Sequence, residues 1–319
     1  MFSTLVLSGG SLHTLSYIGA IKYLEEQNAT KYIKTVIGTS SGAIIGMLFA
    51  MGYKSHEVRT IYQTFLKKHA ETEPDFENIL NIYYSLGIDD GSALREGLSE
   101  AIAAKFGQND LTFLEFAKKT GVNLMVCACR VRDLAETVFS VDTTPNQSII
   151  TAVLASSAIP IIFKPVAISN EMYVDGALSV NCPVKFINPT QLRDTLCFRI
   201  AIPSSNNLET NTSTANSPQF SLSALSLPGF TFSLLINSIN KLNQMNLHTP
   251  FEITFIDFDP LQTSDPDFCT NRFCFDMRTM KFRIHPNEID ELILQGYTKA
   301  HHALAPHFHL TMTSSPEQT

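Results

Sequence analysis

One five-residue segment, residues 38–42 (GTSSG), constrains the fold of this chain more than any other. It fits G-x-S-x-G, in which a serine occupies a sharp turn from a strand into a helix and exposes its hydroxyl. The apolar residues 36–37 predict the end of a buried strand, and residues 41–51 predict a helix that is apolar nearly all round. These flanks favour Ser40 as a nucleophile, with a purely structural glycine turn as the alternative.

The neighbouring segments alternate between strand and helix patterns. Residues 2–7 are an apolar run that ends at Ser-Gly-Gly, which predicts a buried first strand and a tight turn. Residues 14–27 carry apolar side chains at helical spacing. Strand, Gly-rich turn, helix, strand, sharp turn and helix form a βαβ pattern. We therefore expect an α/β fold with a central, mostly parallel sheet between helices.

The same patterns predict the later elements. Helices are expected over residues 55–84, 94–106, 148–157 and 286–304, with another helix capped by Asp110. Strands are expected over residues 122–131, 161–168, 172–174 and 251–258. Residues 203–229 are rich in Ser, Asn, Thr and Pro and predict a flexible loop. We interpret residues 201–319 as a C-terminal continuation of one domain, containing this loop, a strand and the final helix.

Composition limits the kinds of binding partner and the cellular compartment that we expect for this chain. The 319 residues carry a formal net charge of −7, and an acidic chain repels phosphate backbones, so no nucleic-acid partner is expected. The N-terminus lacks the features of a signal peptide, and no stretch reaches the roughly 18–20 apolar residues that span a bilayer. We expect a cytoplasmic protein whose contact with membranes is peripheral. The six scattered cysteines are expected to be reduced structural thiols rather than disulfides or zinc ligands.

A second glycine turn, residues 8–14 (SGGSLHT), follows the first predicted strand. Such loops present free backbone N–H groups. They can cradle phosphate, but the P-loop pattern and G-x-G-x-x-G are both missing from this sequence. They can also stabilise an oxyanion beside Ser40, because both turns follow early strands and would share one sheet edge if those strands are neighbours. A plain tight turn is the remaining alternative.

A third segment places Asp175 after a short predicted strand and before Gly176 and Ala177. Alone this is a weak signal, because Asp-Gly marks many turns. Residues 155–160 (ASSAIP) precede it and residues 181–184 (NCPV) follow it. In order and spacing, these segments and the two glycine turns together resemble the patatin-like phospholipase family. The resemblance covers about residues 3–200 and, more faintly, residues 282–297.

The resemblance implies a patatin-like three-layer α/β/α catalytic domain over residues 3–200, with phospholipase A or esterase activity on lipids. It implies Ser40 as nucleophile and Asp175 as base, with no metal or organic cofactor. Long-chain lipid esters would be the substrates, reached by peripheral contact with a membrane or lipid surface. The oxyanion donors implied are Gly9, Gly10, Ser11 and Ser41, and the supporting motif residues are Gly38, Gly42, Gly176 and Ala177.

The glycine loop departs from the family pattern, D-G-G-G-x-[RK]-G. Here Ser8 replaces the aspartate, Ser11 the third glycine, His13 the basic residue and Thr14 the last glycine. Losing one oxyanion donor typically costs about 10²–10³ in rate. A histidine is mostly neutral at pH 7, so the fixed positive charge is weakened as well. The level of activity and the preference for phospholipid are therefore left open.

Two other interpretations remain at this point. An α/β-hydrolase with a Ser-Asp-His triad shares G-x-S-x-G, but only 39 residues precede Ser40, where that fold normally builds several strands first. A catalytically weakened patatin fold could bind lipid without turnover. Residues 228–242 predict either an interfacial lid or an ordinary core-packing helix. The histidines available to a triad follow Asp175 in the chain: His301, His302, His307 and His309.

Overall fold

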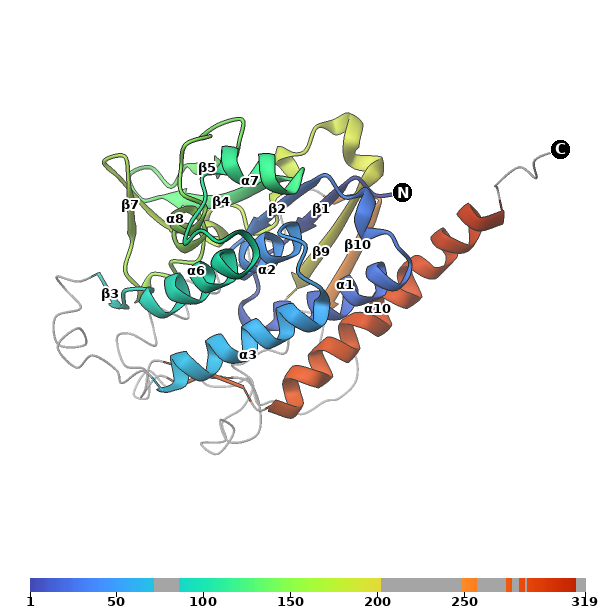
Figure 1. The fold of residues 1–319 in the computed structure, drawn as a ribbon, viewed down its shortest axis with the longest axis horizontal. Coiled ribbons are helices and arrows are strands. Elements are labelled where there is room, and N and C mark those ends of the chain that lie inside the picture. Colours follow the sequence, from blue (N-terminus) through green and yellow to red (C-terminus); the bar gives the residue numbers. More distant parts are fainter. Residues whose placement is uncertain (72–85, 202–247, 257–273, 277–280, 285, 314–319) are drawn as a thin grey trace, which may run out of the picture.

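A mostly parallel sheet forms the centre of the computed structural model, which describes residues 1–71, 86–201, 248–256, 274–276, 281–284 and 286–313 (Figure 1). Its strand order is β10-β9-β1-β2-β4-β8-β7, with β5 paired to β4. The five parallel strands are β1 (Thr4–Leu7), β2 (Thr35–Thr39), β4 (Asn123–Arg130), β9 (Thr195–Ala201) and β10 (Phe251–Ile256). The antiparallel strands are β5 (Glu136–Phe139), β7 (Val166–Ile168) and β8 (Glu171–Asp175). The predicted α/β fold is confirmed.

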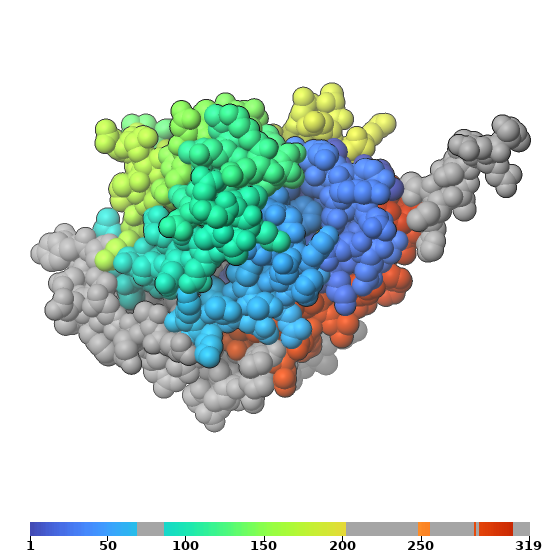
Figure 2. Space-filling model, viewed as in Figure 1, coloured from blue at the N-terminus to red at the C-terminus, as the bar shows by residue number. Residues whose placement is uncertain are grey.

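Helices cover one face of this sheet. The larger core cluster joins Leu5, Leu7 and Val36 of the strands to apolar side chains of these helices. Figure 2 shows part of this helical layer from outside, where the light-blue segment and the green segment after it form adjoining areas. The helices are α1 (Leu15–Glu26), α2 (Ser41–Ala50), α3 (Ser55–Glu71), α6 (Ser92–Phe106), α7 (Phe113–Thr120), α8 (Ile149–Ser156) and α10 (Pro286–Thr313). Short 3-10 helices precede α1 and β2, over Ser11–Thr14 and Thr30–Tyr32. Four short strands form two separate pairs: β3 (Gly87–Asp89) with β6 (Ile161–Phe163), and β11 (Cys274–Asp276) with β12 (Lys281–Arg283).

The opposite face of the sheet is covered by the chain that follows Asp175. Successive strand residues point to opposite faces, so Val6 and Ile37 face away from the helices that contact Leu5 and Val36. In the described part of the chain, their smaller core cluster is filled by strand residues and by the segment 176–194. That segment forms three short 3-10 helices, Gly176–Leu178, Pro183–Phe186 and Pro189–Asp194. It therefore runs across the sheet directly after the candidate base.

The C-terminal helix α10 packs closely against α1, and the two lie side by side in Figure 1. Two glycines make this approach possible. A Cβ at Gly19 would overlap the carbonyl of Ile293, and a Cβ at Gly296 would overlap the carbonyl of Ser16. The two backbones are in contact at this crossing, so α10 and the N-terminal part of the chain are packed together without intervening side chains.

The structure differs from the predicted elements in a few places. Asp110 does not cap the helix that follows it: Thr112 does, in a capping box with Glu115. Asp110 instead accepts hydrogen bonds from Ser148 Oγ and the Leu111 N–H. The strand expected over residues 161–168 is divided into β6 and β7, which belong to different sheets. The strands β3, β5, β9, β11 and β12 were not predicted.

Three predicted segments lie outside the described residues: residues 72–84 of the first long helix, the loop 203–229 and the segment 228–242. Within the described ranges, no helix has both the length and the apolar character needed to cross a membrane.

Candidate active site

Ser40 and Asp175 meet because two strands approach the same edge of β4 from opposite directions. Strand β2 runs parallel to β4 and pairs Thr39 with Cys127. Strand β8 runs antiparallel and pairs Asp175 with Ala128, the next residue of β4. Strand β5 pairs with these same β4 residues, so it occupies the other edge. Ser40, which follows Thr39, and Asp175, the last residue of β8, therefore lie at neighbouring positions.

The turn at Ser40 has the backbone of a nucleophile elbow. Ser40 has φ 55° and ψ −131°, a conformation that non-glycine residues adopt only under constraint. Gly42 allows α2 to approach β1, because a Cβ there would lie 2.5 Å from the carbonyl oxygen of Leu7. The Ser40 N–H donates to Ser156 Oγ (2.8 Å), whose hydroxyl donates to the Cys127 carbonyl (2.5 Å). Ser156 belongs to the ASSAIP segment, which pointed to the family but not to this contact.

The two side chains form a short, buried hydrogen bond. Ser40 Oγ donates to Asp175 Oδ2 at 2.6 Å, and the Ala177 N–H donates to Asp175 Oδ1 at 2.8 Å. Asp175 is only 3% exposed. Burial raises the pKa of its carboxyl group from the usual 3.8 to about 6, and the two hydrogen bonds oppose this change. The carboxylate is therefore ionised at neutral pH and is a stronger base than an exposed aspartate.

The glycine loop lies beside Ser40. A Cβ at Gly9 would be 3.0 Å from the Ser40 Cβ. The Gly9 N–H donates to the Asn181 carbonyl (3.2 Å), whereas the Gly10 N–H donates to Ser41 Oγ (3.3 Å). Among the four predicted oxyanion donors, the Gly9 N–H is thus bonded to Asn181, and the Gly10 N–H is directed toward Ser41, the residue after Ser40.

The other two predicted donors, Ser11 and Ser41, are the first residues of a 3-10 helix and of α2. The first N–H groups of a helix have no acceptor within it. Ser11 has φ 50°, so this non-glycine residue holds a left-handed conformation in place of the family's third glycine. Both N–H groups therefore lie at helix starts, where a developing negative charge is favoured.

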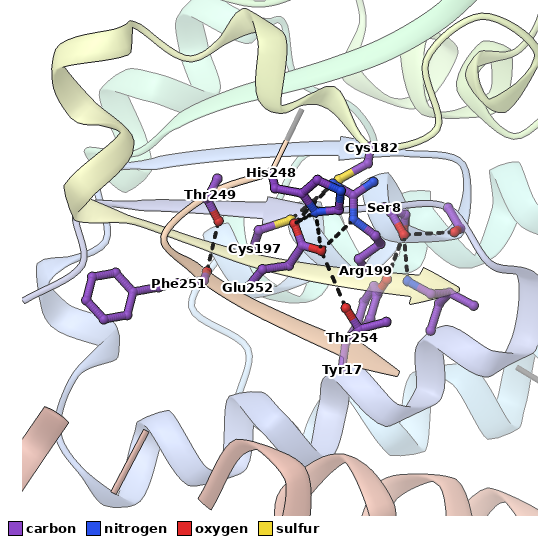
Figure 3. A network of polar contacts seen from close by, with 12 residues as sticks. Ser8, Tyr17, Cys182, Cys197, Arg199, His248, Thr249, Phe251, Glu252 and Thr254 are labelled. Atoms are coloured by element: carbon purple, nitrogen blue, oxygen red, sulfur yellow. Dashed lines mark hydrogen bonds and ion pairs between the residues drawn. The ribbon is translucent and has the colours of Figure 1, made fainter. Parts of the chain in front are cut away.

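Two of the residues that depart from the family loop, Ser8 and Thr14, make buried or part-buried hydrogen bonds. Ser8 Oγ accepts the Ile200 N–H (3.0 Å) and lies 3.0 Å from the Tyr17 hydroxyl (Figure 3). These two contacts join the loop after β1 to β9 and to α1. Thr14 Oγ1 donates to the Ser11 carbonyl (2.7 Å). Both side chains are buried. The substituted residues thus stabilise the loop itself.

A buried ion pair joins β9 to the edge strand β10 near this loop. Arg199 of β9 binds Glu252 of β10 through Nε (2.9 Å) and Nη2 (3.1 Å), and His248 Nδ1 lies 3.0 Å from Glu252 Oε1 (Figure 3). A paired guanidinium is tolerated in a buried strand because its charge is matched. Nearby, Cys182 and Cys197 face each other, and all four cysteines whose side chains are described are free: Cys127, Cys129, Cys182 and Cys197.

The C-terminal histidines do not gather at the carboxyl end of the parallel strands, where Ser40 lies. His307 stacks on Phe2, which precedes β1, and His301 contacts the ring of Tyr23 in α1. Ser40, by contrast, follows the carboxyl end of β2, at the opposite end of the parallel strands. His302 is exposed, and the side chain of His309 lies outside the described residues. The contacts of His301 and His307 thus give a Ser-Asp-His triad no support.

Comparison with known proteins gives one family match and matches to individual proteins. The family model for patatin-like phospholipase matches residues 5–187. A probable lipid hydrolase, 463L of Invertebrate iridescent virus 6, is 32% identical over 194 residues, or 57% of this chain and 62% of that protein. The uncharacterized protein R571 of Acanthamoeba polyphaga mimivirus is 26% identical over 185 residues, or 56% of this chain and 59% of that protein. The matches thus cover about three fifths of each viral relative.

Among solved structures, VipD from Legionella pneumophila is similar to this chain with a TM-score of 0.49 and 16% identity. The match covers 96% of this chain and 67% of VipD.

Proposed function

Because the chain belongs to the patatin-like phospholipase family, we propose that it hydrolyses fatty-acyl esters of lipids, with Ser40 as nucleophile and Asp175 as base. The observation that carries this proposal is the 2.6 Å hydrogen bond from Ser40 Oγ to Asp175 Oδ2. A nucleophile and a base within hydrogen-bond reach are the requirement for covalent acyl transfer. The viral relative described as a probable lipid hydrolase supports the substrate class.

The reaction proceeds in two steps. Asp175 accepts the Ser40 proton while Ser40 Oγ attacks the ester carbonyl carbon, and the alcohol leaves with that proton to give an acyl-enzyme. Asp175 then takes a proton from water, the resulting hydroxide attacks the acyl-enzyme, and the proton returns to Ser40 Oγ as the fatty acid departs. The carboxyl pKa of about 6 suits this role, because the group is ionised at neutral pH yet basic enough to accept a proton.

Backbone N–H groups stabilise the negative oxygen formed in both steps. The Gly10 N–H is the first candidate, because its bond to Ser41 Oγ is long (3.3 Å) and a substrate oxygen can displace that hydroxyl. The N–H groups of Ser11 and Ser41 stand at helix starts and complete the proposed set. Gly9 then contributes backbone space rather than a donor, since its own N–H is bonded to Asn181.

The proposal extends to the setting in which the enzyme works. Its substrates are long-chain lipid esters, met at a membrane or lipid surface by peripheral contact in the cytoplasm. The catalytic domain is assigned to residues 3–200, with residues 201–319 as a continuation of the same domain. β10 pairs with β9, and α10 packs on α1, which supports the continuation.

The decisive experiment compares wild type with Ser40→Ala and Asp175→Asn on a panel of lipid esters, with fluorophosphonate labelling alongside. Ser99→Ala is the matched control, because Ser99 lies on the surface of α6 and only donates to the Asn109 carbonyl. Wild type and the control should label and release fatty acid. Ser40→Ala should do neither, and Asp175→Asn should lose at least about 10³-fold in rate.

Labelling of Ser40→Ala at the wild-type rate would refute the nucleophile assignment. A folded wild type that binds lipid vesicles but neither labels nor releases fatty acid would identify a lipid-binding protein without turnover.

A further inference from the structure

Asn181 contacts Gly9 with both its backbone and its side chain. The Asn181 carbonyl accepts the Gly9 N–H (3.2 Å), and Asn181 Nδ2 donates to the Gly9 carbonyl (3.1 Å). Asn181 is buried, with 4% of its surface exposed. Its Oδ1 atom lies so close that a Cβ on Gly9 would be 2.5 Å away. One residue thus holds both polar groups of Gly9, from a position 172 residues later in the chain.

This contact helps to set which way the next peptide faces, together with Ser8 Oγ, which donates to the same Gly9 carbonyl (3.0 Å). The Gly9 carbonyl and the Gly10 N–H belong to one peptide unit, and in a trans peptide they point in opposite directions. No peptide bond of the described chain is cis. Holding the carbonyl toward Asn181 therefore keeps the Gly10 N–H on the other side, where it meets Ser41 Oγ.

A peptide between two glycines needs such a restraint. Glycine populates positive and negative φ about equally, so a Gly-Gly peptide can rotate with little steric resistance. A rotated peptide would present the Gly9 carbonyl oxygen where the proposed mechanism requires an N–H. An oxygen acceptor at that point would repel the oxyanion instead of stabilising it.

We propose that Asn181 is a positioning residue for acyl transfer: its carboxamide fixes the Gly9–Gly10 peptide so that the Gly10 N–H faces the Ser40 site. The inference rests on the proposed function and adds a residue to it. Asn181 also lies six positions after Asp175, on the segment that crosses the sheet. The same short segment therefore sets both the base and the oxyanion donor.

A purely structural role is the competing explanation, and one detail speaks against it. Asn181 Oδ1 is buried and has no hydrogen-bond partner among the described residues. A buried, unsatisfied carboxamide oxygen lowers stability. A side chain that served only to fill this space would be better apolar, so the donor half of the carboxamide is the part that explains asparagine here.

The test measures kcat per active site in Asn181→Ala and Asn181→Asp. Both variants remove the Nδ2 donor, and the aspartate keeps the shape of the side chain. Active sites are counted by fluorophosphonate titration, so misfolded protein does not enter the result. We expect kcat per titrated site to fall on the order of 10²-fold, with KM changed less than about threefold. Asn188→Ala is the matched control, because Asn188 caps a 3-10 helix in the same segment, and it should leave both constants unchanged.

The possible failures are distinguishable. If wild type neither titrates nor turns over, the proposed function fails and the positioning role fails with it. If wild type is active and Ser40→Ala is not, but both Asn181 variants keep the wild-type kcat per site, only the positioning role is wrong. If Asn181→Ala does not fold, Asn181→Asp decides alone. A crystal structure of either variant provides a second readout, since a Gly9 carbonyl still directed away from Ser41 would also overturn the inference.

Discussion

Replacing Asp175 with asparagine should stabilise the folded protein at neutral pH while it abolishes turnover. The Asp175 carboxyl has its pKa raised from 3.8 to about 6 by burial. At about 1.4 kcal/mol per pH unit, the gap between 3.8 and 6 corresponds to about 3 kcal/mol. Asparagine keeps both contacts, because its oxygen can accept the Ala177 N–H and its amide can donate to Ser40 Oγ. It carries no charge, so it avoids the cost of a buried carboxylate.

The size of this stabilisation depends on pH in a defined way. Below pH 3.8 the carboxyl is protonated in both the folded and the unfolded state, and its burial carries no charge penalty. Between pH 3.8 and about 6 the unfolded state releases the proton while the folded state keeps it, so the free energy of unfolding decreases as pH rises. Above pH 6 the penalty is complete. The advantage of Asp175→Asn should therefore be near zero at pH 4 and about 3 kcal/mol at pH 8.

Urea denaturation of wild type and Asp175→Asn at several pH values between 4.5 and 8 measures this directly. Asp142→Asn is the matched control, because Asp142 is a surface carboxylate that accepts one hydrogen bond from Asn123. That control should show no gain that grows with pH. A difference between Asp175→Asn and wild type that stays constant across the range, or that shrinks as pH rises, would refute the assignment of a buried carboxyl with a raised pKa.

Four further outcomes are expected. Since Asp175 must be ionised to act as base, kcat/KM should fall about tenfold per pH unit below pH 6, measured on a soluble ester. Ser156→Ala removes the acceptor of the Ser40 N–H and should slow fluorophosphonate labelling by about ten- to a hundredfold, in a protein that still folds by circular dichroism. Gly97→Ala should raise the free energy of unfolding by about 0.5–1 kcal/mol, because alanine is favoured over glycine inside a helix such as α6. A Cβ at Gly97 would meet no other atom, since it would face open space beside an apolar pocket. Gly296→Ala should lower the free energy of unfolding by about 1–3 kcal/mol, because α1 leaves no room; equal effects of the two glycine changes would contradict the packing argument.

The two glycine turns at the site, residues 38–42 and residues 8–14, could be predicted because each follows local rules. The turn at Ser40 shows itself through Gly38 and Gly42, which lie where the backbone is crowded. The meeting of Ser40 with Asp175 follows no local rule, because it depends on a shared edge of β4 and on a register set by Thr39 and by Ala128. For that pairing the sequence offered only a family resemblance.

The elements that escaped prediction depend on partners far away in the chain. Strand β9 contains Arg199, which interrupts its apolar pattern and is matched by Glu252 of β10, 53 residues later. Asp110 has the chemistry of a helix cap, but Ser148, 38 residues away, draws its carboxylate elsewhere. The contact of Asn181 with Gly9 spans 172 residues. Periodicity and capping rules read short windows, so none of these pairings could be obtained from them.

Three features that lower stability converge at the carboxyl end of β2, and each supplies something that the proposed reaction needs. Ser40 has a φ of 55°, which presents its hydroxyl at the turn. Asp175 carries a buried carboxyl, and the burial that destabilises its charge is also what makes it basic. Asn181 keeps an unsatisfied carboxamide oxygen while its amide orients Gly10. For Asp175, the destabilised charge and the increased basicity are both expressed by the same raised pKa. Stabilisation at neutral pH and loss of turnover must therefore appear together in Asp175→Asn. A variant with the full gain in stability and unchanged turnover would show that this carboxylate is not the base.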